Sequence, residues 1–178
     1  MIRLFTAIEL PEGVRTRLAL LQGGVPGARW SPVENLHLTT RFIGEVDEAT
    51  ANDIDDMLAA IRSPAFDLTL KGAGEFGGRD PHALWIGVAP NEGLMRLAAK
   101  IESALQRMGL DAETRKYTPH VTMARLRDAP IAKVREFLAA HAAFDSGPFP
   151  VRGFALFSSH PSQNGSLYRV ERTYALEA

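Results

Sequence analysis

The chain carries one short pattern twice, a histidine followed by a bulky apolar residue and a threonine. The copies are His37-Leu38-Thr39 and His120-Val121-Thr122, and the second histidine lies 83 positions after the first. Both copies lie in segments with alternating apolar residues, 36–43 and 121–126, which predicts two half-buried strands. Because alternate side chains of a strand share a face, each His and Thr should lie together, with the apolar residue between them in the core.

The remaining pattern alternates between strands and helices. Helices are expected after Pro11 and Pro130, and after the capping residues Asp47 and Asn91. Their apolar residues recur at helical spacing. The alternation predicts further strands at 2–9, 66–71, 83–89, 149–157 and 167–176, the third of them central because it is apolar on both faces. Glycine, proline and polar residues predict turns or loops at 72–80 and 158–166.

These elements divide into two halves, each with strands, helices and one His-apolar-Thr strand. This division indicates a duplicated architecture with a cleft between two lobes. A length of 178 residues is enough for one domain with a full core. We therefore expect a pseudo-symmetric α+β fold and a single bilobal domain over residues 1–178.

Composition narrows the function only slightly. Lys and Arg together number 20 and Asp and Glu 21, so the formal net charge of -1 gives no overall attraction to nucleic acid. Any affinity for phosphate must be local. The absence of cysteine excludes thiol nucleophiles and thiolate metal sites. The apolar run at 1–8 is too short for a secretory signal and no stretch is long enough for a membrane helix, so we expect a cytoplasmic protein without membrane contact.

Two histidines and two threonines in this arrangement suit phosphate chemistry. Two imidazoles from separate strands can divide the work of acid and base, and threonine hydroxyls can donate hydrogen bonds to phosphoryl oxygens. A single histidine in a strand is more often structural. However, two of the five histidines share this frame, which favours a functional pair.

The flanking residues extend both motifs. The segments Trp30-Ser31-Pro32-Val33-Glu34-Asn35-Leu36-His37-Leu38-Thr39-Thr40-Arg41-Phe42-Ile43-Gly44-Glu45-Val46 and Tyr117-Thr118-Pro119-His120-Val121-Thr122-Met123-Ala124-Arg125 resemble the two signature motifs of the 2H phosphoesterases. Within that superfamily they are most similar to the RNA 2′,3′-cyclic phosphodiesterases, long called 2′-5′ RNA ligases. The resemblance implies two antiparallel-rich sheets lining a central cleft, with helices outside.

The resemblance also implies a reaction and its residues. RNA ends or nucleotides bearing a 2′,3′-cyclic phosphate would be hydrolysed to a 2′-phosphate, without a metal or other cofactor, and the reverse 2′-5′ ligation is a related activity. By the family pattern His37 matches the proton donor and His120 the acceptor, although their local contexts alone do not separate these roles. Thr39 and Thr122 would hold the phosphoryl oxygens.

Two arginines are further candidates for substrate binding. Arg41 shares the face of His37 if the strand is regular, and is otherwise a solvated residue at a strand edge. Arg125 matches an arginine that often follows the second motif, but in ideal alternation it points away from His120, so its use requires a bulge or turn. Around the motifs, Trp30, Phe42 and Tyr117 are either core residues or platforms for a base.

Several other histidines and arginines lie outside both motifs. The cleft-rim candidates are Arg152, His160 and Arg169, and the residues expected at the surface are His82 and His141.

The alternative functions are a phosphodiesterase for another small cyclic phosphate and a binding module for RNA ends or nucleotides without turnover. Metal binding is the least favoured of these alternative functions, because histidine and threonine without nearby carboxylates make a weak ligand set. We expect a monomer.

Overall fold

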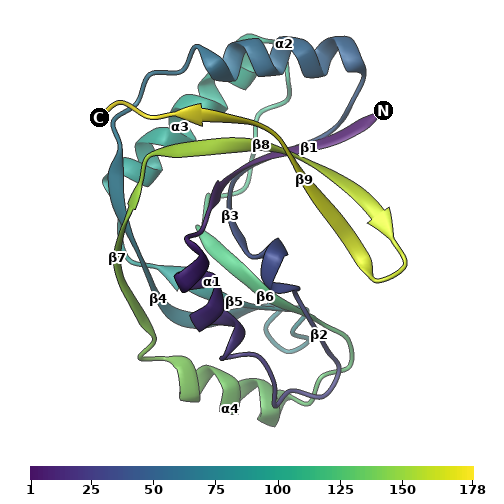
Figure 1. Ribbon diagram of the computed structural model, residues 1–178. Coiled ribbons are helices and arrows are strands. Elements are labelled where there is room, and N and C mark those ends of the chain that lie inside the picture. The colour runs from purple at the N-terminus through teal and green to yellow at the C-terminus, as the bar shows by residue number, and fades with distance from the viewer.

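The structure, a computed structural model that describes residues 1–178, contains four α-helices, a short 3-10 helix and nine β-strands (Figure 1). The strands are β1 (Ile2–Glu9), β2 (Ala28–Trp30), β3 (His37–Val46), β4 (Phe66–Phe76), β5 (Ala83–Val88), β6 (His120–Leu126), β7 (Asp145–Val151), β8 (Gly153–Ser162) and β9 (Gly165–Ala175). The helices are α1 (Glu12–Ala19), α2 (Glu48–Ala59), α3 (Glu92–Arg107) and α4 (Ile131–His141), and η1 (Val33–Asn35) is the 3-10 helix.

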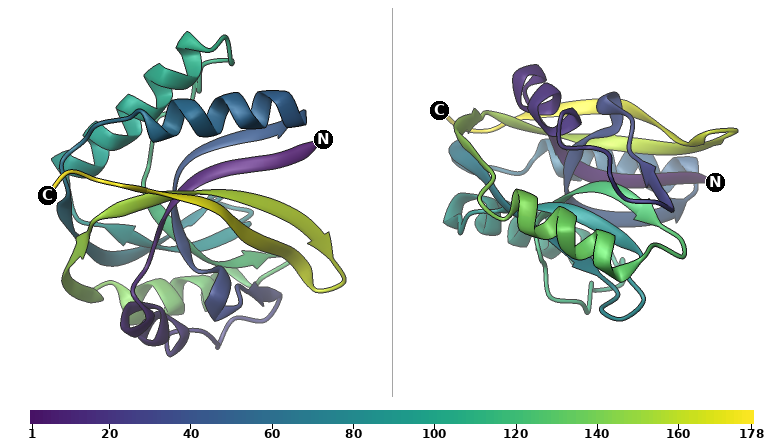
Figure 2. Two further views of the ribbon diagram at one scale, coloured as in Figure 1. Left: turned by 45° about the horizontal axis from the view of Figure 1, so that its top comes forward. Right: turned by 90° about the horizontal axis from the view of Figure 1, so that it is seen from below.

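The strands form two antiparallel sheets, each with one of the two motif strands. One sheet has the order β3-β1-β8-β9 and the other the order β2-β6-β5-β4-β7, in which β5 is central as expected. Helices α2 and α3 pack outside the first sheet, and α4 packs against β4 of the second (Figures 1 and 2). The expected α+β fold, with two antiparallel sheets and helices outside, is confirmed.

The two sheets do not correspond to two halves of the sequence. The first sheet takes β1 and β3 from the beginning of the chain and β8 and β9 from its end, while the middle strands and β2 form the second. The chain consequently passes from one sheet to the other four times, at the connections β1–β2, β2–β3, β3–β4 and β7–β8. Each lobe is therefore assembled from distant segments.

The four predicted helices are confirmed, and side chains cap the starts of α2 and α3. The carboxylate of Asp47 accepts from the backbone N–H of Thr50 at 2.7 Å, and the Asn91 side chain accepts from that of Leu94 at 2.9 Å. Gly109, with a φ of +95°, follows the end of α3 in the left-handed conformation that glycine adopts without strain.

Three strand predictions are wrong. β4 continues past Gly72 to Phe76, because a register shift between Leu70 and Ala73 lets the strand bend without ending. The single strand predicted at 149–157 is two strands that belong to different sheets, with Arg152 at the break. The loop predicted at 158–166 is mostly the β8–β9 hairpin.

The polar composition of that hairpin hides its strand character. Ser158 is fully buried in β8, where its hydroxyl hydrogen-bonds to the Glu171 carboxylate and, at 2.8 Å, to Nε2 of His160. A buried polar residue with its partners supplied by a neighbouring strand leaves no hydrophobic signal in the sequence. β2, only three residues long, is likewise an element that the sequence did not predict.

Most buried apolar side chains form one cluster of 31 residues between the sheets and helices. A second, smaller cluster consists of Phe5, Ala7, Ala155 and Phe157, with Tyr168 packed against it. β1 contributes to both clusters, since Leu4 and Ile8 face the larger one while Phe5 and Ala7 face the smaller. The smaller cluster lies on the same face of the first sheet as His37, and it forms an aromatic wall beside that residue.

Candidate active site

Both motif histidines are held by the same local bond. Nδ1 of His37 lies 2.6 Å from the carbonyl oxygen of Asn35, and Nδ1 of His120 lies 2.7 Å from that of Thr118, in each case two residues earlier. A carbonyl oxygen only accepts, so Nδ1 carries the hydrogen in both rings. Nε2 is therefore the atom of each imidazole that can gain or lose a proton.

His37 is enclosed by aromatic side chains. Its ring centroid lies 5.0 Å from that of Phe5, 5.3 Å from Tyr168 and 5.9 Å from Phe157, and its Nε2 lies 3.0 Å from the Thr39 hydroxyl. Burial lowers the pKa of His37, and the bond to the Asn35 carbonyl opposes that effect only partly. The charge of His120 lowers the pKa further, so the two imidazoles are close enough to influence each other.

His120 is more open. The edge of its ring meets Phe76 at 4.9 Å between centroids, Trp85 lies at 6.0 Å, and its Nε2 has no hydrogen-bond partner within the protein. Burial is again the main cause that lowers the pKa of His120, the Thr118 carbonyl opposes it, and the positive charge of Arg125 lowers it further. His120 thus presents an unoccupied Nε2 beside a cation.

A β-bulge follows the threonine of the first motif and redirects Arg41. Thr39 is opposite Ala7 and Arg41 is opposite Thr6, so Thr40 is the extra residue in the register with β1. The Arg41 side chain is consequently turned to α3, where its guanidinium pairs with the Glu102 carboxylate and donates to the Asp111 carbonyl at 2.7 Å. β3 is therefore not regular, and the premise that Arg41 shares the face of His37 is wrong. With its side chain 10% exposed, Arg41 is not a solvated edge residue either.

A bulge at the equivalent place in β6 has the opposite effect on Arg125. Thr122 is opposite Trp85 and Ala124 is opposite Leu84, so Met123 is the unpaired residue. Arg125 then pairs with Ala83, which shares the face of Trp85 and hence of Thr122. We predicted that Arg125 could turn toward His120 only if the strand contained a bulge or a turn. Such a bulge is present.

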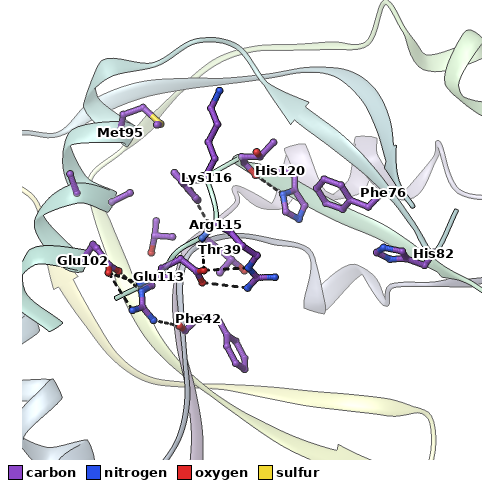
Figure 3. A pocket seen from close by; sticks show the side chains of 16 residues that line it. Thr39, Phe42, Phe76, His82, Met95, Glu102, Glu113, Arg115, Lys116 and His120 are labelled. Carbon is purple, nitrogen blue, oxygen red and sulfur yellow. Dashed lines mark hydrogen bonds and ion pairs between the residues drawn. The ribbon is translucent and has the colours of Figure 1, made fainter. Parts of the chain in front are cut away.

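A cavity of about 630 Å³ opens beside the two motifs (Figure 3). Thr39 from one sheet and His120 from the other both line it, together with Phe42, Met95 and the segment 115–118. The Tyr117 hydroxyl donates to the Thr39 carbonyl at 2.8 Å and so ties this segment to β3. The two motif strands therefore contribute to a single hollow, with His37 bonded to Thr39 at its edge.

The charged side chains of the cavity are mostly paired with one another. Arg41 pairs with Glu102, and Arg115 pairs with Glu113 at 3.3 Å, whereas Lys116 has no partner. The bonds from Arg41, Gln106 and the backbone of Glu113 hold the pKa of Glu102 down at about 2, against the smaller opposing effect of burial.

The remaining sequence candidates are divided between core and surface. Trp30 is a core residue against Phe137 of α4, while Phe42 is 44% exposed in the cavity wall. His82 is exposed as expected but also lines the cavity, and His141 packs on Phe137 with a centroid distance of 4.5 Å. Arg152 and Arg169 are exposed, and His160 is bonded to Ser158.

Sequence reasoning missed the side chains that surround the two histidines. Phe5, Phe157 and Tyr168 around His37, and Phe76 and Trp85 around His120, come from other strands. The strand that contains Phe5 was predicted, but its own residues do not show that the Phe5 ring packs against His37. That knowledge requires the strand pairing.

Two features are absent from the fold. Nowhere do three or more His, Cys, Asp or Glu side chains gather in a group that could hold a metal ion. None of the helices combines the length and apolar character that crossing a bilayer requires.

Comparison with known proteins identifies relatives along nearly the whole chain. An RNA 2′,3′-cyclic phosphodiesterase of Aeropyrum pernix is 34% identical over 159 residues, covering 88% of this chain and 90% of the relative. One of Escherichia coli is 31% identical over 178 residues, covering 98% and 96%. The crystal structure of E. coli LigT complexed with 3′-AMP superimposes with a TM-score of 0.81 at 27% identity, covering 99% of both chains.

A family model agrees with these relatives. The model described as the 2′-5′ RNA ligase superfamily matches residues 14–163, a span that includes both His-apolar-Thr motifs. This match confirms the resemblance drawn from the two motifs. The chain belongs to the 2′-5′ RNA ligase superfamily.

Proposed function

We propose that this protein is a metal-independent phosphodiesterase that opens 2′,3′-cyclic phosphates at RNA ends or on nucleotides and leaves a 2′-phosphate. The names of its relatives support the activity. The observation that carries the proposal is the matched pair of imidazoles, each with Nδ1 fixed by a backbone carbonyl and Nε2 left to exchange a proton.

The reaction divides between the two histidines. Nε2 of His120 takes a proton from water while the water oxygen forms its bond to phosphorus. The bond from phosphorus to the 3′-oxygen breaks on the opposite side, and the imidazolium of His37 gives its Nε2 proton to that oxygen. The hydroxyls of Thr39 and Thr122 donate to the non-bridging oxygens as charge builds up in the transition state.

The charges around each ring support this division of roles. The guanidinium of Arg125 favours the neutral form of His120, which is the form that a base requires. The only charged group that lowers the pKa of His37 is His120 itself. A bound phosphate anion would raise the pKa of His37 and supply the imidazolium when the substrate arrives. Arg125 would also offer its charge to that phosphate.

The cavity offers room for the nucleoside. Its volume of about 630 Å³ is in the range of small-molecule sites. Phe42 is 44% exposed in its wall and presents an aromatic ring on which a base can stack. Arg41 lines the same cavity, but its charge is already paired with Glu102, so we assign it the role of holding the wall in place.

The decisive experiment offers the purified protein an oligonucleotide with a 2′,3′-cyclic phosphate end, and the matching mononucleotide, in the presence of EDTA. We expect turnover of the oligonucleotide to a 2′-phosphate, identified by its resistance to a 3′-specific phosphatase, and no turnover by the His120→Ala variant. Binding without turnover would instead establish a module for RNA ends. Turnover that requires added metal would overturn the metal-independent mechanism.

The same assay separates the remaining alternatives. Turnover of the mononucleotide alone would favour a phosphodiesterase for a small cyclic phosphate. Formation of a 2′-5′ linkage when an acceptor with a free 5′-hydroxyl is added would reveal the reverse ligation. A monomeric state and a location in the cytoplasm complete the proposal, and sedimentation analysis of the purified protein tests the former.

A further inference from the structure

Two arginines lie directly opposite each other at the edge of the second sheet. β2 pairs with β6 so that Arg29 is opposite Arg125, between the pairs Ala28–Leu126 and Trp30–Ala124. Trp30 points into the core against Phe137, so its neighbour Arg29 points to the other face of the sheet. That face carries Thr122 and Arg125. Arg29 therefore belongs to the face of the sheet that holds the second motif.

Neither arginine is neutralised. The four ion pairs of the protein involve Arg41, Arg115, Lys133 and Arg172, and no side-chain hydrogen bond is donated by Arg29 or Arg125. Like charges directly opposite on antiparallel strands repel each other. A pair of this kind concentrates positive potential on a surface and attracts anions to it.

The Arg29 side chain contacts the first sheet. The guanidinium lies against the turn of the β8–β9 hairpin, where a methyl group on Gly165 would come within 3.4 Å of its Nη2 atom. Close by, the Asn35 side chain donates to the Ser166 carbonyl at 3.0 Å and joins the start of β9 to η1. Arg29 thus lies where the two sheets meet, beyond Arg125 as seen from His120.

The spacing separates the roles of the two arginines. Four residues of β6, including the bulged Met123, lie between His120 and Arg125, and Arg29 lies on the next strand, opposite Arg125. Arg125 acts on the pKa of His120 and so belongs to the reacting phosphate. Arg29 lies one strand farther from β5 and has no partner within the protein, so it is free to bind a second phosphate. In an RNA end the nearest other phosphate is on the 5′-oxygen of the same terminal nucleotide.

We propose that Arg29 binds this 5′-phosphate and makes the enzyme prefer a terminal nucleotide that carries one, as every RNA chain end does. The inference rests on the proposed function, because that function defines the reacting phosphate from which the second one is counted. It assigns a residue outside both signature motifs to substrate selection.

The test compares two stable ligands that differ only in the second phosphate, adenosine 2′-phosphate and adenosine 2′,5′-bisphosphate, by isothermal titration calorimetry. The wild-type protein should bind the bisphosphate roughly tenfold more tightly, the effect of one charge-assisted hydrogen bond. Arg29→Gln should bring the ratio of affinities close to one, and Arg29→Lys should restore part of it. Added salt should reduce the wild-type ratio.

Arg135→Gln is the matched control, because Arg135 is exposed on α4, outside the second sheet, and loses the same charge. It should keep the wild-type ratio. A wild-type ratio of one, or an Arg29→Gln variant that keeps the full preference, overturns the assignment of Arg29. A parallel assay with the corresponding 2′,3′-cyclic phosphates tests the proposed function separately. If the wild-type protein hydrolyses neither substrate, the catalytic proposal fails while the binding ratio still decides the role of Arg29.

Discussion

The two motif strands resemble each other up to the threonine and differ after it. In both, Nδ1 of the histidine bonds to a carbonyl two residues earlier, and in both a bulge follows the threonine. The bulge in β3 turns Arg41 away to Glu102, whereas the bulge in β6 turns Arg125 onto the motif face. The same irregularity therefore removes a cation from one histidine and brings a cation to the other.

The surroundings of the two rings add to this difference. His37 is enclosed by three aromatic rings and its Nε2 is bonded to Thr39, whereas Nε2 of His120 is free. Two copies of one motif can thus acquire distinct chemical roles without any change in the motif itself. The neighbours supplied by the fold produce the asymmetry that an acid and base pair requires.

Removing either imidazole should have the largest effect. We expect His37→Ala and His120→Ala each to lower kcat by roughly two to four orders of magnitude, because each ring transfers a proton in the transition state. Steady-state kinetics on a 2′,3′-cyclic phosphate measures the loss, and circular dichroism verifies the fold. Wild-type rates in either variant would remove the pair from the mechanism.

Replacing the two threonines should reveal a smaller difference between the two motifs. Thr39→Val and Thr122→Val each remove one donor to the phosphoryl oxygens, which we expect to cost roughly 100-fold in kcat. Thr39 also bonds to Nε2 of His37, so its replacement should additionally displace the pH profile. A Thr122→Val variant with the same displacement would contradict the contrast drawn between the two motifs.

The pH dependence should distinguish the two arginines. Because the pKa values of both histidines are lowered, the bell-shaped profile of kcat/KM should have its maximum on the acid side of 6.5. Arg125→Gln removes a charge that lowers the pKa of His120, so the profile should move to higher pH. Arg41→Gln should leave it in place, since Arg41 is turned to Glu102. A shift of equal size in both variants would show that the bulges do not separate them.

The smallest effect is expected on stability. Arg41→Gln breaks a largely buried ion pair and should lower the free energy of unfolding by about 1–3 kcal/mol near neutral pH. The folded-state pKa of Glu102 is about 2 against an ordinary 4.5, so its contribution is complete above 4.5 and is lost as the pH falls toward 2. Denaturant titrations should therefore show the difference between variant and wild type shrinking below pH 4.5. A difference that is constant with pH would assign the loss to packing instead.

The sequence predicted features that depend on neighbouring residues. Helix caps such as Asp47 and Asn91 act within one turn, and the strand β1 follows from its own alternation. The face shared by His37 and Thr39 follows in the same way. These features therefore needed no knowledge of which strands pair.

Features that depend on a partner strand escaped prediction. Thr40 and Met123 are bulged only in relation to β1 and β5, so alternation alone placed Arg41 on the wrong face. Ser158 is polar yet buried, because Glu171 of the next strand satisfies its hydroxyl. β2 is too short to produce a pattern, although it carries Arg29. What the sequence missed is thus the pairing between distant segments.

The four passages of the chain between the sheets bear on how the molecule opens and unfolds. Two lobes that are joined by a single connection can move apart about a hinge. Here four connections of the chain join the two sheets. We therefore expect substrate to enter a site that is already assembled, without closure of one lobe on the other. We also expect both sheets to be lost together in one cooperative transition, which near- and far-ultraviolet circular dichroism should report at the same denaturant concentration.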